Sequence, residues 1–128
     1  MEVLLVVEEA RLRDLLAVGL DQVEDVSWTS CPFRSARERF RQRRFDVVIL
    51  DLGAEDDEAQ RIIDTFRKSP GRVEIVLITD NRPGRYLSQS GDKTKLVHFI
   101  QKPVDTKGFF YLLARLKNRL SPHPAAAR

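Results

Sequence analysis

Short apolar runs recur along the chain and alternate with segments of helical spacing. Four of these runs have the length and the β-branched content of strands buried on both faces, at residues 3–7, 47–50, 75–78 and 96–100. Apolar and polar side chains alternate over residues 26–30, which is typical of a strand nearer a sheet edge. The pattern therefore predicts five strands.

Helical periodicity fills most of the intervals between these strands. Apolar side chains fall on one helix face in residues 12–23, 59–66 and 109–120. A weaker helix that carries Ala36 and Phe40 follows the second predicted strand. Each of these segments can cover one face of a sheet.

Five repeats of strand then helix predict an α/β fold. We expect a doubly wound, five-stranded parallel sheet of the (βα)5 flavodoxin-like type, with strand order 2-1-3-4-5. The weakest repeat lies in residues 79–96, where Pro83, Gly84 and Gly91 would leave the fourth helix short or poorly anchored.

The chain has 128 residues, which is enough for one domain with a sizeable core. We predict that this domain spans residues 1–121 and that residues 122–128 are a disordered tail or the start of a linker. No apolar run is long enough for a signal peptide or a membrane span, so we predict a cytoplasmic protein without a membrane partner. Cys31 is the single cysteine, which excludes an internal disulfide framework.

Polar side chains follow the predicted strands at one edge of the sheet. Glu8 and Glu9 follow the first strand, Asp51 the third, Thr79 the fourth and Lys102 the fifth. The carboxyl ends of parallel strands meet at one edge, and ligands bind there where the strand order reverses. Taken singly, each residue also has a structural explanation as a strand-ending polar group, a helix cap or a solvated charge.

Taken together, these groups favour phosphoryl transfer. Crowded carboxylates repel one another, and a divalent cation relieves that repulsion. Hard oxygen ligands select Mg²⁺ rather than Zn²⁺. A lysine and a hydroxyl would hold an anion beside the ion, and a carboxylate could then attack phosphorus to give an aspartyl phosphate.

The ordered set of motifs resembles the response-regulator receiver domain of bacterial two-component signalling. The matching stretches are LLVVEE, VVILDL, IVLIT and FIQKP, and the resemblance covers nearly all of residues 3–120. It implies that Asp51 is the phosphoacceptor in a Mg²⁺-dependent reaction that the domain itself catalyses, without being an enzyme in the usual sense. The implied metal ligands are the side chains of Glu9 and Asp51 and the carbonyl of Gly53, with Glu8 bound mainly through water.

The same resemblance implies a switch and its partners. Thr79 and Lys102 would contact the phosphoryl oxygens, and movement of the threonine would be coupled to Phe99. The bond before Pro103 would be cis. A histidine kinase or a histidine phosphotransfer protein would donate the phosphoryl group, and the fourth and fifth helices would form the surface for a homodimer or an effector.

Several positions depart from the usual receiver pattern and keep a second function open. Both acidic residues after the first strand are Glu, the loop after Asp51 has Glu55 where a proline is usual, and Asp80 replaces a small residue after the threonine. A phosphorylation-independent pseudo-receiver that acts as a protein-interaction module is therefore the alternative. A small flavodoxin-like nucleotide-binding enzyme is a further alternative, although the sequence has no GxGxxG or GKS phosphate loop.

Arginines concentrate around the second predicted helix, in the stretch FRSARERFRQRRF. The net charge of the chain is only +3, so these residues form a local basic region. Its two explanations are a solvated helix face and a docking surface for an acidic partner. Direct nucleic-acid binding is not expected, because no recognition motif or aromatic stacking platform accompanies the arginines.

Overall fold

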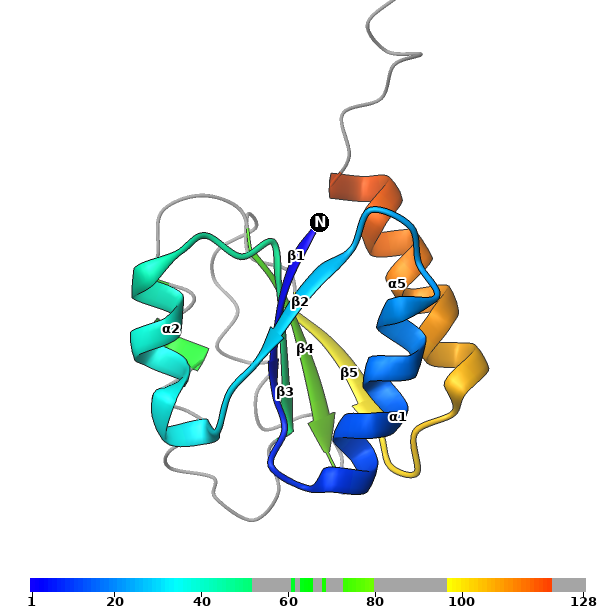
Figure 1. Cartoon of the computed structure of the whole chain (residues 1–128), viewed down its shortest axis with the longest axis horizontal. Coiled ribbons are helices and arrows are strands. Elements are labelled where there is room, and N and C mark those ends of the chain that lie inside the picture. Colours follow the sequence, from blue (N-terminus) through cyan, green and yellow to red (C-terminus); the bar gives the residue numbers. More distant parts are fainter. Residues whose placement is uncertain (52–60, 62, 66–67, 69–72, 80–96, 121–128) are drawn as a thin grey trace, which may run out of the picture.

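The computed structural model describes residues 1–51, 61, 63–65, 68, 73–79 and 97–120. A five-stranded parallel sheet in the order β2-β1-β3-β4-β5 forms its centre (Figure 1), as the sequence predicts. The strands are β1 (Glu2–Val6), β2 (Ser27–Ser30), β3 (Val47–Asp51), β4 (Glu74–Thr79) and β5 (Val97–Gln101).

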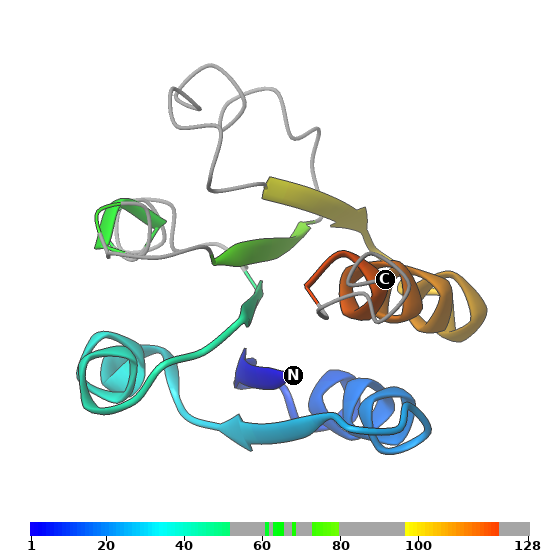
Figure 2. The same ribbon diagram turned by 90° about the horizontal axis from the view of Figure 1, so that it is seen from above.

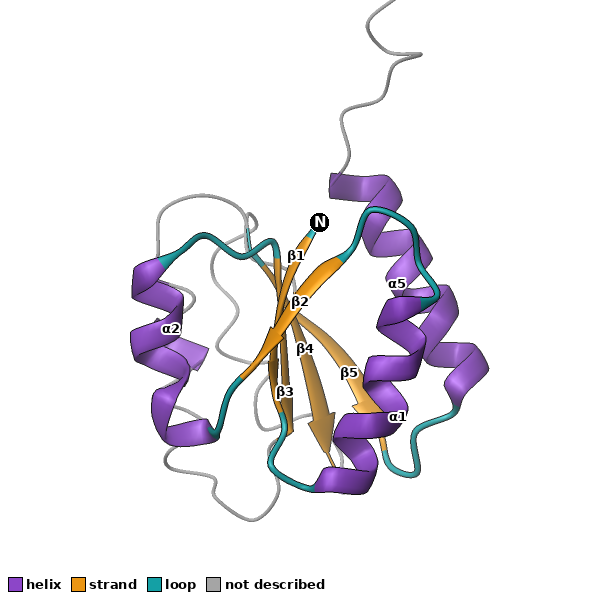
Figure 3. Cartoon of the chain, in the orientation of Figure 1, coloured by secondary structure: helices purple, strands orange, loops and turns teal. Residues whose placement is uncertain are grey.

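Helices cover both faces of the sheet (Figure 3). They are α1 (Ala10–Asp21), the short 3-10 helix η1 (Phe33–Ser35), α2 (Ala36–Gln42) and α5 (Thr106–Leu120). Residues 61, 63–65 and 68 are helical and belong to the predicted third helix, whereas the predicted fourth helix lies outside the described residues. None of the helices in the described part of the chain is long and apolar enough to cross a membrane.

The two faces of the sheet bury two separate cores, because successive side chains of a strand point to opposite faces. On one face, α1 and α5 pack over Leu5, Ile49 and Val76. On the other face, α2 and Ile63 pack over residues that include Leu50. Figure 2 shows the two helical layers on either side of the sheet. The buried strands β1, β3 and β4 therefore read as continuous apolar runs in the sequence.

Helices α1 and α5 approach closely at Gly19. A Cβ atom built on Gly19 would lie 2.8 Å from Cδ2 of Phe109, a side chain that is itself buried. Packed interiors do not absorb such a contact without displacement of their side chains. The absence of a side chain at Gly19 thus sets the distance between the two helices.

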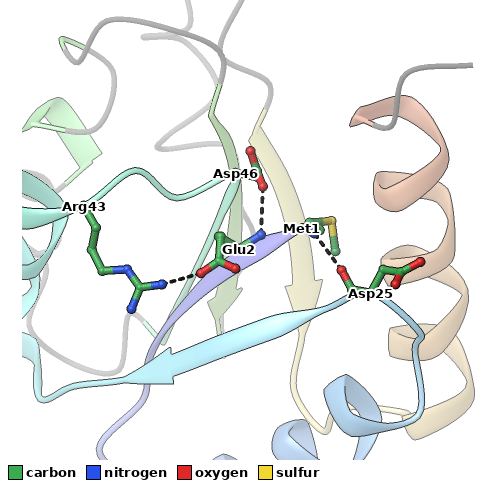
Figure 4. Close-up of polar contacts among 5 residues, drawn as sticks. All are labelled: Met1, Glu2, Asp25, Arg43 and Asp46. Carbon is green, nitrogen blue, oxygen red and sulfur yellow. Dashed lines mark hydrogen bonds and ion pairs between the residues drawn. The ribbon is translucent and has the colours of Figure 1, made fainter.

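A polar network holds the amino-terminal end of β1 (Figure 4). The Met1 ammonium donates to the Asp25 carbonyl oxygen at 2.7 Å, and the Glu2 amide donates to Asp46 Oδ2 at 2.8 Å. Arg43 forms an ion pair with the Glu2 carboxylate. These contacts join the amino-terminal edges of β1 and β3 to the chain that leaves α2.

Candidate functional site

Asp51 and Lys102 meet at the carboxyl edge of the sheet. Asp51 is the last residue of β3, and Lys102 follows the end of β5. The Lys102 Nζ lies 3.0 Å from Oδ1 and 3.3 Å from Oδ2 of Asp51, so it reaches across the end of β4 to the carboxylate. The Asp51 side chain is 12% exposed. The carboxylate is therefore held by a fixed positive charge and still open to solvent.

Thr79 ends β4 between these two residues and is buried. Its carbonyl oxygen accepts a hydrogen bond from the Lys102 amide at 2.9 Å, which fixes the backbone of the lysine to the sheet. The Lys102–Pro103 bond is cis, the conformation that the resemblance implies.

Phe99 lies on β5 two residues before Gln101, the residue that pairs with Thr79. Residues two apart in a strand share a face, so Phe99 and Thr79 lie on the same face of the sheet. The Phe99 ring is half-buried against the core on that side. Its position is compatible with the coupling that the resemblance implies.

The acidic residues after β1, Glu8 and Glu9, are both exposed. Glu8 Oε1 accepts a hydrogen bond from the Phe33 amide at 3.2 Å, at the start of η1. Glu9 is exposed at the start of α1, and its carbonyl oxygen accepts from the Arg13 amide. Within the described ranges, no three His, Cys, Asp or Glu side chains are grouped so that they could hold a metal ion.

Two positions that bear on the predicted site are not described. Gly53, the predicted carbonyl ligand, and Asp80, the acidic departure after Thr79, both lie outside the described residues. Their part in the site stays a prediction.

Cys31 does not have the surroundings of a nucleophile. The side chain is buried, and burial raises the pKa of the thiol, an effect that the nearby charge of Arg39 only partly opposes. A raised pKa leaves little thiolate near neutral pH, and the thiolate is the reactive form. Cys31 is thus a small member of the hydrophobic core.

A buried acid with a histidine and an arginine as partners lies at the opposite edge of the sheet, and the sequence did not predict it. Glu74 opens β4 and its side chain is fully buried. Its Oε1 lies 3.1 Å from Nε2 of His98 on β5 and 3.1 Å from a guanidinium nitrogen of Arg119 on α5. The only sequence signal is a glutamate at the start of the apolar stretch VEIVLIT.

Solved structures share this architecture. The regulatory domain of the MrkE protein from Klebsiella pneumoniae has a TM-score of 0.77 at 14% identity, over 93% of this chain and 97% of that one. The response-regulator domain of CheB from Thermotoga maritima has a TM-score of 0.67 at 20% identity, over 95% and 98%. The chain has the receiver fold.

The receiver fold also occurs in a protein described as the CpaE2 pilus assembly protein from Sinorhizobium meliloti. That structure has a TM-score of 0.71 at 11% identity, over 91% of this chain and 99% of that one. No family model and no curated protein matches the sequence. At these identities the similarity establishes the receiver fold, and the function has to be argued from the site.

Proposed function

We propose that the chain is a receiver domain of two-component signalling in which Asp51 accepts a phosphoryl group. The donor would be the phosphohistidine of a histidine kinase or of a histidine phosphotransfer protein. The observation that carries the proposal is the contact between Asp51 and Lys102 at the carboxyl edge of a receiver-type sheet. A partly exposed carboxylate beside a fixed lysine is the pairing that a phosphoacceptor requires.

In the proposed reaction, a carboxylate oxygen of Asp51 attacks the phosphorus atom of the phosphohistidine. The new P–O bond forms as the P–N bond breaks, and the imidazole leaves with a proton from solvent. Lys102 neutralises charge on the phosphoryl oxygens, and the Thr79 hydroxyl donates a hydrogen bond to one of them. The chain is modified and does not turn over a substrate, so the role is regulatory.

Magnesium is part of this proposal through the chemistry of the donors. When bound, Mg²⁺ would neutralise charge between the carboxylates and the incoming phosphoryl group. Glu9 and Asp51 offer the hard oxygen ligands that the ion prefers. The described residues do not provide a complete set of ligands for the ion, because the Glu8 carboxylate is hydrogen-bonded to the Phe33 amide. We therefore assign no step of the reaction to the ion.

The output surface of the proposed receiver is the region of β5 and α5. A hollow of about 490 Å³ lies there, and Phe99, Pro103 and Phe109 contribute to its lining. The Phe99 ring packs on the opposite face of the sheet from α5, so coupling of Thr79 to Phe99 would reach this region through the strand β5 itself. A second copy or an effector protein would bind it.

The arrangement around Glu8 favours one competing function, the phosphorylation-independent interaction module. In such a module, the Glu8 carboxylate would serve to hold the backbone of η1, and no metal would be required. Such a module would keep one conformation in the presence of a phosphoryl analogue.

Addition of Mg²⁺ and beryllofluoride distinguishes the two functions. We expect amide NMR signals near Asp51, Thr79 and Phe99 to shift in the wild type and to stay unchanged in Asp51→Asn. The matched control is Asp14→Asn, which removes one exposed carboxylate from α1 and should respond like the wild type. No shift in the wild type at millimolar Mg²⁺ would overturn the proposal and support the interaction module.

A further inference from the structure

A groove of about 1050 Å³ lies between α2 and the helical residues 61, 63–65 and 68. These segments run side by side on the face of the sheet opposite α1 and α5 (Figures 1 and 2). Aromatic side chains form part of its floor, since Phe40 and Phe45 stack with ring centroids 6.4 Å apart. The sequence indicated the arginines of α2, but not that Arg61, Asp64 and Lys68 line a groove with them.

The groove has a surplus of positive charge. Two acids, Asp46 and Asp64, contribute to the lining. The cationic side chains in the lining are Arg37, Arg41, Arg43, Arg44, Arg61 and Lys68. Six cations against two acids leave a difference of four positive charges.

Some of the charged side chains in the groove lining already have partners within the fold. Arg43 pairs with Glu2, and the Asp46 carboxylate accepts the Glu2 amide (Figure 4). In the part of the chain that the structure describes, no hydrogen bond or ion pair is found for the side chains of Arg37, Arg41 and Arg44. All three are exposed. Their charges are available to a partner.

Helix stability does not explain the placement of Arg37. Arg37 lies in the first turn of α2, where a positive charge interacts unfavourably with the helix dipole. Arg37 and Arg41 are four residues apart on one helix face, so their like charges repel. Each effect is small, but both oppose folding, which is expected when a charge serves binding.

We propose that this groove binds an acidic polypeptide segment, rich in Asp and Glu, of a partner protein. Arginine forks match carboxylates in a bidentate geometry. The cations are exposed and distributed along a helix and across a groove. This arrangement suits a segment that carries several carboxylates along its sequence. A single small anion would instead require convergent, buried donors.

The aromatic side chains favour a peptide over a nucleic acid. Single-stranded nucleic acids bind by stacking bases on exposed aromatic faces. Here Phe45 is buried, and the Arg43 guanidinium lies over its ring at 5.4 Å from the centroid. Phe40 packs against Phe45. The rings therefore shape the groove and do not offer a platform for bases.

The groove is separate from the Asp51 site. Asp46 and Val73 in its lining precede β3 and β4, whereas Asp51 and Thr79 end the same strands. Binding of an acidic segment should therefore not depend on phosphorylation. The Asp51→Asn variant should bind the acidic segment as the wild type does. Failure of the groove proposal can therefore be distinguished from failure of the proposed phosphoacceptor function.

The test is fluorescence anisotropy with a labelled Asp/Glu-rich peptide, at low and at physiological salt. The groove variant carries Arg37→Glu, Arg41→Glu and Arg44→Glu, and we expect it to weaken binding at least about tenfold. The matched control carries Arg11→Glu, Lys107→Glu and Arg115→Glu, the same charge change at exposed positions elsewhere, with less than about a twofold effect. Circular dichroism checks folding, and the corresponding Arg→Gln triple variant replaces the groove variant if it does not fold.

Three outcomes would overturn the proposal. In the first, the peptide does not bind the wild type. In the second, the control variant weakens binding as much as the groove variant, which would mean that the peptide is attracted by the net charge of the protein alone. In the third outcome, a single-stranded oligonucleotide binds the groove more tightly than the peptide does, which would make the groove a nucleic-acid site.

Discussion

Asp51 and Glu74 are carboxylates at opposite ends of neighbouring strands, and they differ in how far their side chains are exposed to solvent. The Asp51 side chain keeps 12% of its surface exposed and has Lys102 beside it. The Glu74 side chain is fully buried, with both His98 and Arg119 at 3.1 Å. Solvent therefore reaches part of the first side chain and none of the second.

This difference is the one expected between the proposed phosphoacceptor and a structural acid. A buried charge must be compensated within the fold, because removal from water costs several kcal/mol. Glu74 joins β4 to β5 through His98 and to α5 through Arg119. Asp51 makes a contact that an incoming phosphoryl group could replace. Charge pairing alone does not identify a functional site; pairing together with access does.

Loss of Arg119 should give the largest effect. Arg119→Met removes a guanidinium partner from a fully buried acid, and we expect it to lower the free energy of unfolding by about 3 kcal/mol. Lys117→Met is the control from the same last turn of α5, because Lys117 pairs only with the exposed Asp25 at 3.7 Å and should cost about 0.5 kcal/mol or less. Urea denaturation measures both, and equal losses would show that Glu74 does not depend on Arg119.

Loss of Lys102 should have a smaller effect on stability. Lys102→Met removes the cation beside Asp51, whose side chain is still partly exposed, so we expect a change of about 1 kcal/mol in the free energy of unfolding. The same variant should lose the NMR response to Mg²⁺ and beryllofluoride. A loss of stability as large as that of Arg119→Met would mean that Asp51 is as enclosed as Glu74, and the contrast between the two acids would fail.

Charge reversal on α2 should have the smallest effect. Arg37→Glu improves the interaction of the first turn with the helix dipole and Arg41→Glu worsens that of the last turn, so the two effects offset. We expect the double variant to change the free energy of unfolding by less than about 0.5 kcal/mol. Thermal and urea unfolding give the comparison, and a clear loss would show that this face of α2 is packed within the fold.

The sequence was sufficient to predict the sheet and the edge at which Asp51, Thr79 and Lys102 lie. Parallel strands buried on both faces appear as apolar runs, and right-handed crossovers leave few strand orders. Once the order is fixed, the last residues of β3 and β4 and the residue after β5 must be neighbours. The contact of Lys102 with Asp51 follows from topology more than from any single motif.

Side-chain direction and long-range partners could not be predicted in the same way. The sequence places Glu8 near Asp51, but the hydrogen bond to the Phe33 amide depends on the path of the chain after β2. Glu74 resembles an isolated polar residue at a strand start, and its partners His98 and Arg119 come from distant elements. Such contacts depend on packing, which local periodicity does not encode.

The close approach at Gly19 has a mechanical consequence. With Phe109 directly against the backbone of α1, no side chain at Gly19 acts as a spacer, and neither helix can slide or tilt without pushing the other. We therefore expect helices α1 and α5 to move together as one rigid unit over their face of the sheet. Any displacement of α5 at the proposed output surface would be transmitted to the beginning of α1, directly after the acidic pair Glu8 and Glu9.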